Sequence, residues 1–100
     1  MPELCITLLC PNALKEKLLD LLLMSPNMTV FTSTATSAHG LAHAALGQTE
    51  QVLGRAHATT IQVIFAAADK TALLEALRRQ FAGAGLRYWV TPVIEAGEIA

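Results

Sequence analysis

The chain has 100 residues, of which 53% are hydrophobic and 15% are charged, and its formal net charge is -1. A chain of this length is typical of one domain, and it has no basic stripe that would neutralise nucleic acid phosphates. The longest leucine-rich run, Leu18 to Met24, contains Asp20 and is too short to cross a bilayer. Glu3 stands where a signal peptide carries Lys or Arg. We therefore expect a single cytoplasmic domain over residues 1–100, with no nucleic acid partner and no direct membrane insertion.

The first part of the chain predicts a strand, a helix and a second strand. Residues 3–9 alternate between two faces, as a strand does. Leucines then recur at helical spacing between Pro11, which is typical of a helix start, and a break at residues 25–27. Residues 28–36 are rich in Thr, Val and Phe, which favours a second strand.

The last part predicts a strand, a helix and a final strand. The third strand runs from about residue 52 to residue 66 and is most regular in the stretch TTIQVIFA. Asp69 is in the position of a helix cap, and Gly83 and Gly85 are typical of the residues that follow a helix. Residues 86–94 predict the last strand. The expected apolar stripe of this helix consists of Leu73, Leu74, Leu77 and Phe81.

The predicted order, βαββαβ, indicates an α+β fold of the ferredoxin-like type. Right-handed crossovers then give a four-stranded antiparallel sheet with both helices on one face. The other face is left without cover, although it carries apolar side chains, so we expect a symmetric oligomer to bury it. By alternation, this open face contains Cys5, Thr7, Leu9, Thr60, Gln62, Ile64, Trp89 and Val93.

All three histidines lie in residues 37–57. His39 and His43 are four residues apart, so a helical turn would place both imidazoles on one face, and His57 or Glu50 could complete a site for zinc, copper, nickel or cobalt. The spacing is that of HExxH, but residue 40 is glycine, so the catalytic glutamate of a metalloprotease is absent. Two alternatives stay open: the loop histidines bind no metal, or His57 is a partly buried strand residue.

Glu50, Gly54 and Arg55 form a second candidate group just before the third strand. Arg55 either pairs with Glu50 to anchor this segment or binds an anionic ligand. Gly54 allows the backbone to bend there. The sequence has no paired carboxylates, no nucleophile with a convincing base and no cofactor fingerprint, so we expect neither an enzyme nor an organic cofactor.

The sequence resembles the PII-like superfamily of trimeric signalling proteins through His39-Gly40, the stretch EQVLGR at residues 50–55 and an aromatic last strand. It is most similar to a small PII-like family whose genes often lie beside heavy-metal efflux systems in proteobacteria. The resemblance implies a homotrimer, a T-loop at about residues 36–54 and ligand sites between subunits near the base of that loop. It also implies a partner among membrane transporters, such as an efflux component.

The stretch FAGAGLRY departs from the nucleotide-binding pattern of PII proteins. It is short and offers Arg87 as its only cation, so we expect weak ATP binding or none. Three functions remain open. The first is a sensor that answers to a divalent metal or small ligand and contacts an efflux partner. The second is a PII-like regulator that binds a nucleotide or another small molecule, and the third is a passive trimeric metal-binding protein.

Overall fold

The computed structural model describes residues 2–25, 30–39 and 55–100. The chain forms β1 (Glu3–Pro11), the 3-10 helix η1 (Asn12–Leu14), α1 (Lys15–Met24), β2 (Phe31–His39) and β3 (Arg55–Ala66). The 3-10 helix η3 (Ala67–Asp69), α3 (Lys70–Phe81) and β4 (Arg87–Val93) follow. The predicted βαββαβ order is therefore confirmed.

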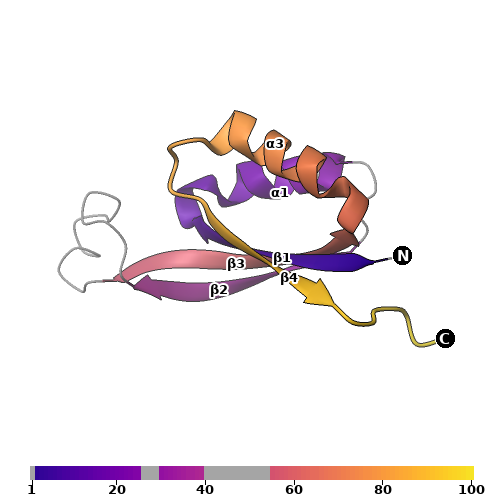
Figure 1. Ribbon diagram of the computed structural model, residues 1–100. Helices are drawn as coiled ribbons and strands as arrows, with labels where there is room; N and C mark the ends of the chain where they lie inside the picture. Colours follow the sequence, from indigo (N-terminus) through magenta and orange to yellow (C-terminus); the bar gives the residue numbers. More distant parts are fainter. Residues whose placement is uncertain (1, 26–29, 40–54) are drawn as a thin grey trace.

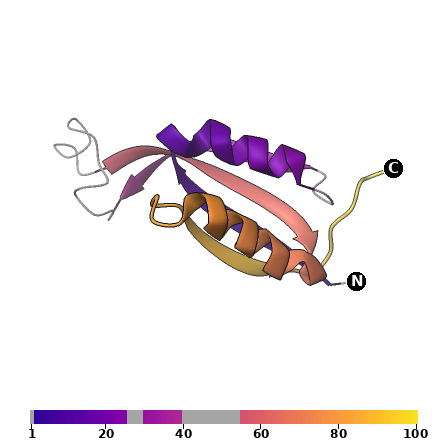
Figure 2. The same ribbon diagram turned by 90° about the horizontal axis from the view of Figure 1, so that it is seen from above.

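The four strands form one antiparallel sheet in the order β2-β3-β1-β4. Both helices cover the same face of this sheet (Figure 1), and they lie side by side when the sheet is seen from above (Figure 2). The fold is ferredoxin-like, as the sequence predicts. Neither helix of the described part of the chain has the length and apolarity needed to cross a membrane.

The hydrophobic core lies between the sheet and the two helices. Each helix contributes its predicted apolar stripe, and Leu18, Leu22 and Leu77 are among the residues removed from solvent. The sheet side of the core alternates along the two central strands, as period-two burial requires. Its fully or almost fully buried members are Ile6, Leu8 and Cys10 in β1 and Ile61, Val63 and Phe65 in β3.

The open face has the composition that the sequence predicts. The register pairs Cys5 with Ile64 and Thr7 with both Gln62 and Trp89, so these side chains share the face away from the helices. Ile64 is 39% exposed and Trp89 is 50% exposed. Thr7 lies between two longer neighbours and is buried, and its Oγ1 accepts a hydrogen bond of 3.4 Å from Gln62 Nε2.

Several predicted boundaries were wrong. The second strand was expected at residues 28–36, but β2 begins at Phe31 and continues to His39 because it pairs with β3 along its whole length. Asp69 occupies the cap position of α3, but its side chain makes no capping hydrogen bond. A 3-10 turn leads into each helix instead, η1 before α1 and η3 before α3.

Candidate functional site

β2 and β3 continue beyond the rest of the sheet as a two-stranded arm. The last residue of β1, Pro11, pairs with Ala58, so residues 55–57 have no partner in β1 and pair only with β2. We call residues 37–39 and 55–57 the arm. It lies at the end of the sheet where β2 ends and β3 begins (Figure 1).

The arm brings two of the predicted metal ligands together. Ser37 pairs directly with His57, and His39 is two residues further along β2, so His39 and His57 share one face as diagonal cross-strand neighbours. Such neighbours are about 7–8 Å apart, with their Cβ atoms somewhat closer. Both imidazoles are exposed. Two histidines at this spacing can approach a single metal ion from adjacent strands.

The sequence analysis expected a different pair, His39 and His43, to share one face of a helical turn. Residues 37–39 are strand rather than helix, so His39 does not start a helical turn. His57 alternates with Ile61 and Val63 as predicted, but it is exposed and not partly buried. His43 and Glu50 lie outside the described residues, and so does the helical spacing of His39 and His43.

The second candidate group is placed in part. Arg55 is the first residue of β3 and pairs with His39, which puts its backbone at the base of the predicted loop. Gly54 and Glu50 lie outside the described residues. The predicted loop of residues 36–54 is shortened at its start, because residues 36–39 belong to β2. Within the described residues, no three His, Cys, Asp or Glu side chains come together as a metal site.

A pocket that the sequence analysis missed lies beside the turn between α3 and β4. It has a volume of about 160 Å³, and its floor is apolar, formed by residues such as Leu77, Phe81 and Leu86. Arg78 and Tyr88 also line it. We call it the α3–β4 pocket. The spacing of Leu74, Leu77, Arg78 and Phe81 on one helix would have been the only signal for it in the sequence.

The turn beside this pocket needs its two glycines. Gly83 and Gly85 have φ angles of 76° and 86°, which side chains with a Cβ rarely adopt. Lys17 of α1 holds the end of α3 from the other side. Its Nζ donates a hydrogen bond of 3.5 Å to the Gln80 carbonyl oxygen and lies 5.3 Å from the centre of the Phe81 ring.

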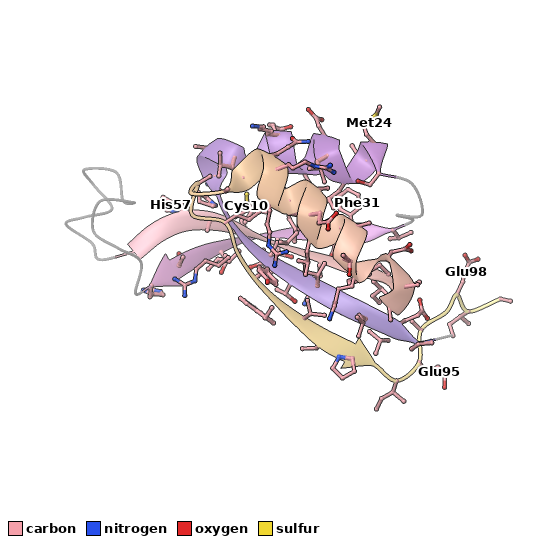
Figure 3. The ribbon with its side chains drawn as sticks, turned by 45° about the horizontal axis from the view of Figure 1, so that its top comes forward. Cys10, Met24, Phe31, His57, Glu95 and Glu98 are labelled. Carbon is pink, nitrogen blue, oxygen red and sulfur yellow. The ribbon has the colours of Figure 1, made fainter. Side chains whose placement is uncertain are left out.

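Arginines and glutamates gather at opposite ends of the sheet. Arg78 and Arg79 are in the last turn of α3, and Arg87 begins β4, so cations surround the turn. Figure 3 shows His57 at the arm and Glu95 and Glu98 at the opposite end of the molecule. An anionic ligand would therefore be attracted to the α3–β4 turn rather than to the end that carries the acidic residues.

A family model described as "Protein of unknown function (DUF3240)" matches residues 1–100. A DUF3240 family protein from Shewanella baltica OS155 is 20% identical, with a TM-score of 0.81 and coverage of 98% of this chain and 97% of that chain. No curated protein matches the sequence.

Two PII-like structures also match over nearly the whole fold. CPII from Thiomonas intermedia K12, described as a nitrogen regulatory PII-like protein bound to ADP, AMP and bicarbonate, is 18% identical with a TM-score of 0.75. The match covers 99% of this chain and 98% of that chain. GlnK from B. subtilis is 16% identical with a TM-score of 0.68, and the match covers 94% and 87% of the two chains. The chain therefore has the PII-like fold.

Proposed function

Because this chain belongs to the DUF3240 family and has a PII-like fold, we propose that it is a non-enzymatic regulatory protein that senses a divalent metal ion. In this proposal the ion binds at the arm and changes the conformation of the segment between β2 and β3. That segment then contacts a transport protein, such as a metal efflux component. The PII-like regulatory fold supports the general class of function, and the arm supports the metal.

The observation that carries the metal proposal is the placement of His39 and His57 on one face of the arm. Neutral imidazole is a common ligand of zinc, copper, nickel and cobalt. Both side chains are exposed, so an ion can reach them without opening the core. Two ligands give moderate affinity, and we propose that His43 or Glu50 adds a third from the intervening segment.

Calorimetric titration of the four metal ions tests this proposal. We expect the wild-type chain to bind at least one of them, and His39→Ala or His57→Ala to weaken that binding about tenfold or more, since each removes one of few ligands. Ser37→Ala is the matched control, because Ser37 faces His57 on the same arm but does not ligate metals of this class. Equal binding by the wild type and both histidine variants would contradict the proposal.

A passive metal-binding protein would bind the same ions without passing on a signal. The two functions differ in whether the metal changes the segment between β2 and β3. A sensor should show altered proteolysis of residues 40–54 when metal is added, and this change should be lost in His39→Ala. A passive protein should bind metal with unchanged cleavage.

The α3–β4 pocket favours a second candidate function, in which the protein is a regulator that binds a nucleotide or another small anion. Arg78 lines the pocket and Arg87 follows the turn, so cations are present where an anion would bind. The related fold of CPII, which is described as bound to ADP, AMP and bicarbonate, supports this candidate. If ADP, AMP or bicarbonate binds and the four metals do not, this function replaces the metal sensor.

We also propose that the protein is a homotrimer in which the open face of the sheet is buried. Ile64 and Trp89 are large apolar side chains on a face that no helix covers. Burying them against other copies removes apolar surface from water, at about 25 cal/mol per Å². In this trimer, the ends of the sheet in one copy would lie close to the neighbouring copies.

A further inference from the structure

The segment that follows β4 presents two apolar side chains to solvent. Ile94 and Ile99 are 103% and 97% exposed, so neither contacts the copy of the chain that carries it. We call residues 94–100 the tail. A glutamate stands next to each isoleucine in the sequence, as Ile94-Glu95 and Glu98-Ile99. The tail therefore combines acidic residues with two apolar side chains that the described part of the same copy does not cover.

The tail lies on the open side of the sheet. Ala96, Gly97 and Glu98 line a groove together with Cys5 and Ile64, which belong to the open face. In Figure 1 the tail leaves the sheet at the end opposite to the α3–β4 turn. The residues between Ile94 and Ile99 thus line this groove, while the two isoleucines remain exposed.

The α3–β4 pocket is complementary to this tail in shape and charge. Its volume of about 160 Å³ is close to that of a cavity known to hold a benzene-sized group, so it can take one branched aliphatic side chain. Leu77, Phe81 and Leu86 provide an apolar floor, and Arg78 provides a positive charge beside it. A peptide with adjacent acidic and aliphatic residues matches this arrangement.

A copy of the chain cannot place its tail in its own pocket along the path seen here. The pocket is on the helix side of the sheet, where Leu8 and Tyr88 line it, and the tail is on the open side. The turn and the tail are also separated by the whole of β4, which has seven residues and is about 23 Å long. A tail that fills this pocket must therefore belong to another copy.

We propose that the tail of one copy binds the α3–β4 pocket of a second copy, with Ile99 in the pocket and Glu98 paired with Arg78. Ile99 is six residues beyond the end of β4, which gives it a reach of about 20 Å from the sheet. Ile94 follows the strand directly and has no such reach. The contact is head-to-tail, so it requires at least two copies, and it closes in a ring when the rotation between successive copies closes. This proposal goes beyond the metal site and does not depend on it.

A labelled peptide with the sequence of residues 93–100 tests the contact. Its binding to the full chain carrying Ile99→Ser is measured by fluorescence anisotropy, because this variant has a weakened tail and an intact pocket. We expect the peptide to bind, and its own Ile99→Ser version to bind about tenfold more weakly or worse, since three carbons leave an apolar pocket. No binding of the unchanged peptide would overturn the proposal.

A charge exchange tests the predicted pair. The Glu98→Arg peptide should bind the Ile99→Ser chain several-fold more weakly and should recover when that chain also carries Arg78→Glu. The Glu95→Arg peptide is the matched control, because it has the same change of charge at a position outside the pair. Recovery by both peptides, or by neither, would overturn the assignment of Glu98 to Arg78.

Joint refolding separates a contact between copies from one within a copy. Full chains carrying Arg78→Glu and Ile99→Ser each lose the contact, and each should melt below the wild type. When the two are refolded together, an intact tail meets an intact pocket in mixed assemblies, so part of the sample should melt at a higher temperature. If the mixture melts as the sum of its two components, the contact is not between copies and the proposal fails.

Discussion

Thr59 Oγ1 donates a hydrogen bond of 3.0 Å to Asn12 Oδ1 and so connects β3 to the start of the first helical segment. Thr59 is 3% exposed and lies two residues from His57 on the same face of β3. This bond therefore fixes the point at which the arm leaves the body of the fold. It couples the base of the candidate metal site to the core.

Removing Asn12 should destabilise the fold more than its exposed position suggests. Asn12→Ala leaves the buried Thr59 hydroxyl without this partner, and we expect a loss of about 1–3 kcal/mol in the free energy of unfolding. The double variant Asn12→Ala, Thr59→Val should be more stable than Asn12→Ala alone, because it removes the unpaired hydroxyl as well. Urea denaturation of the wild type, Asn12→Ala, Thr59→Val and the double variant measures the coupling energy between the two side chains. Strictly additive losses of stability would show that the bond contributes nothing.

A charge on the open face should separate the copies. Ile64→Glu places a carboxylate in the proposed interface without a partner, so we expect light scattering to show a smaller species at micromolar concentration. Thr71→Glu, on the exposed side of α3, is the control and should leave the mass unchanged. The only tryptophan, Trp89, gives a second readout, since its emission should shift to longer wavelength when the interface opens.

Adenine nucleotides should bind weakly. The turn from Ala82 to Leu86 contains no lysine, and the cations that flank it in the sequence are the arginines of α3 and β4. Calorimetric titration of ATP and ADP should therefore give dissociation constants well above the micromolar range. A low-micromolar value for either nucleotide would contradict this prediction and favour the small-molecule regulator over the metal sensor.

Ionisation of Cys10 should lower the free energy of unfolding at alkaline pH. Its side chain is fully buried, and this burial raises the pKa of the thiol above the ordinary value of 9.0. The unfolded chain loses the proton at lower pH than the folded chain, so stability is complete below the ordinary pKa and falls as the pH rises towards the folded-state pKa. Cys10→Ala should remove this part of the pH dependence in denaturation between pH 8 and pH 10, whereas Cys5→Ala should retain it.

The alternation of the central strands was predictable because burial on one face leaves a period-two pattern in large side chains. The predicted members of the open face are found on it, and two of them, Cys5 and Ile64, stand opposite one another in the register. The extent of β2 was not predictable, since the stretch STATSAH has small side chains that give no periodic signal. The pairing of His39 with Arg55, rather than local propensity, keeps the last residues of β2 extended.

The candidate sites were predictable only as far as their residue types. The three histidines could be chosen from the sequence, but the shared face of His39 and His57 depends on which residue of β3 stands opposite Ser37. A shift of the register by one residue would have placed them on opposite faces. The α3–β4 pocket depends on how closely α3 approaches Leu8 of β1, and the sequence pattern does not contain this distance between helix and sheet.

The position of β1 between β3 and β4 determines when the sheet can be completed. Glu3 pairs with Val93, so during synthesis β1 stays without one of its neighbours until β4, the last strand of this fold, has been made. Contacts between such distant residues make folding slow, because a long loop must be closed before they stabilise anything. Until then one edge of β1 remains open to strands of other chains, and in that interval the protein depends most on protection from aggregation.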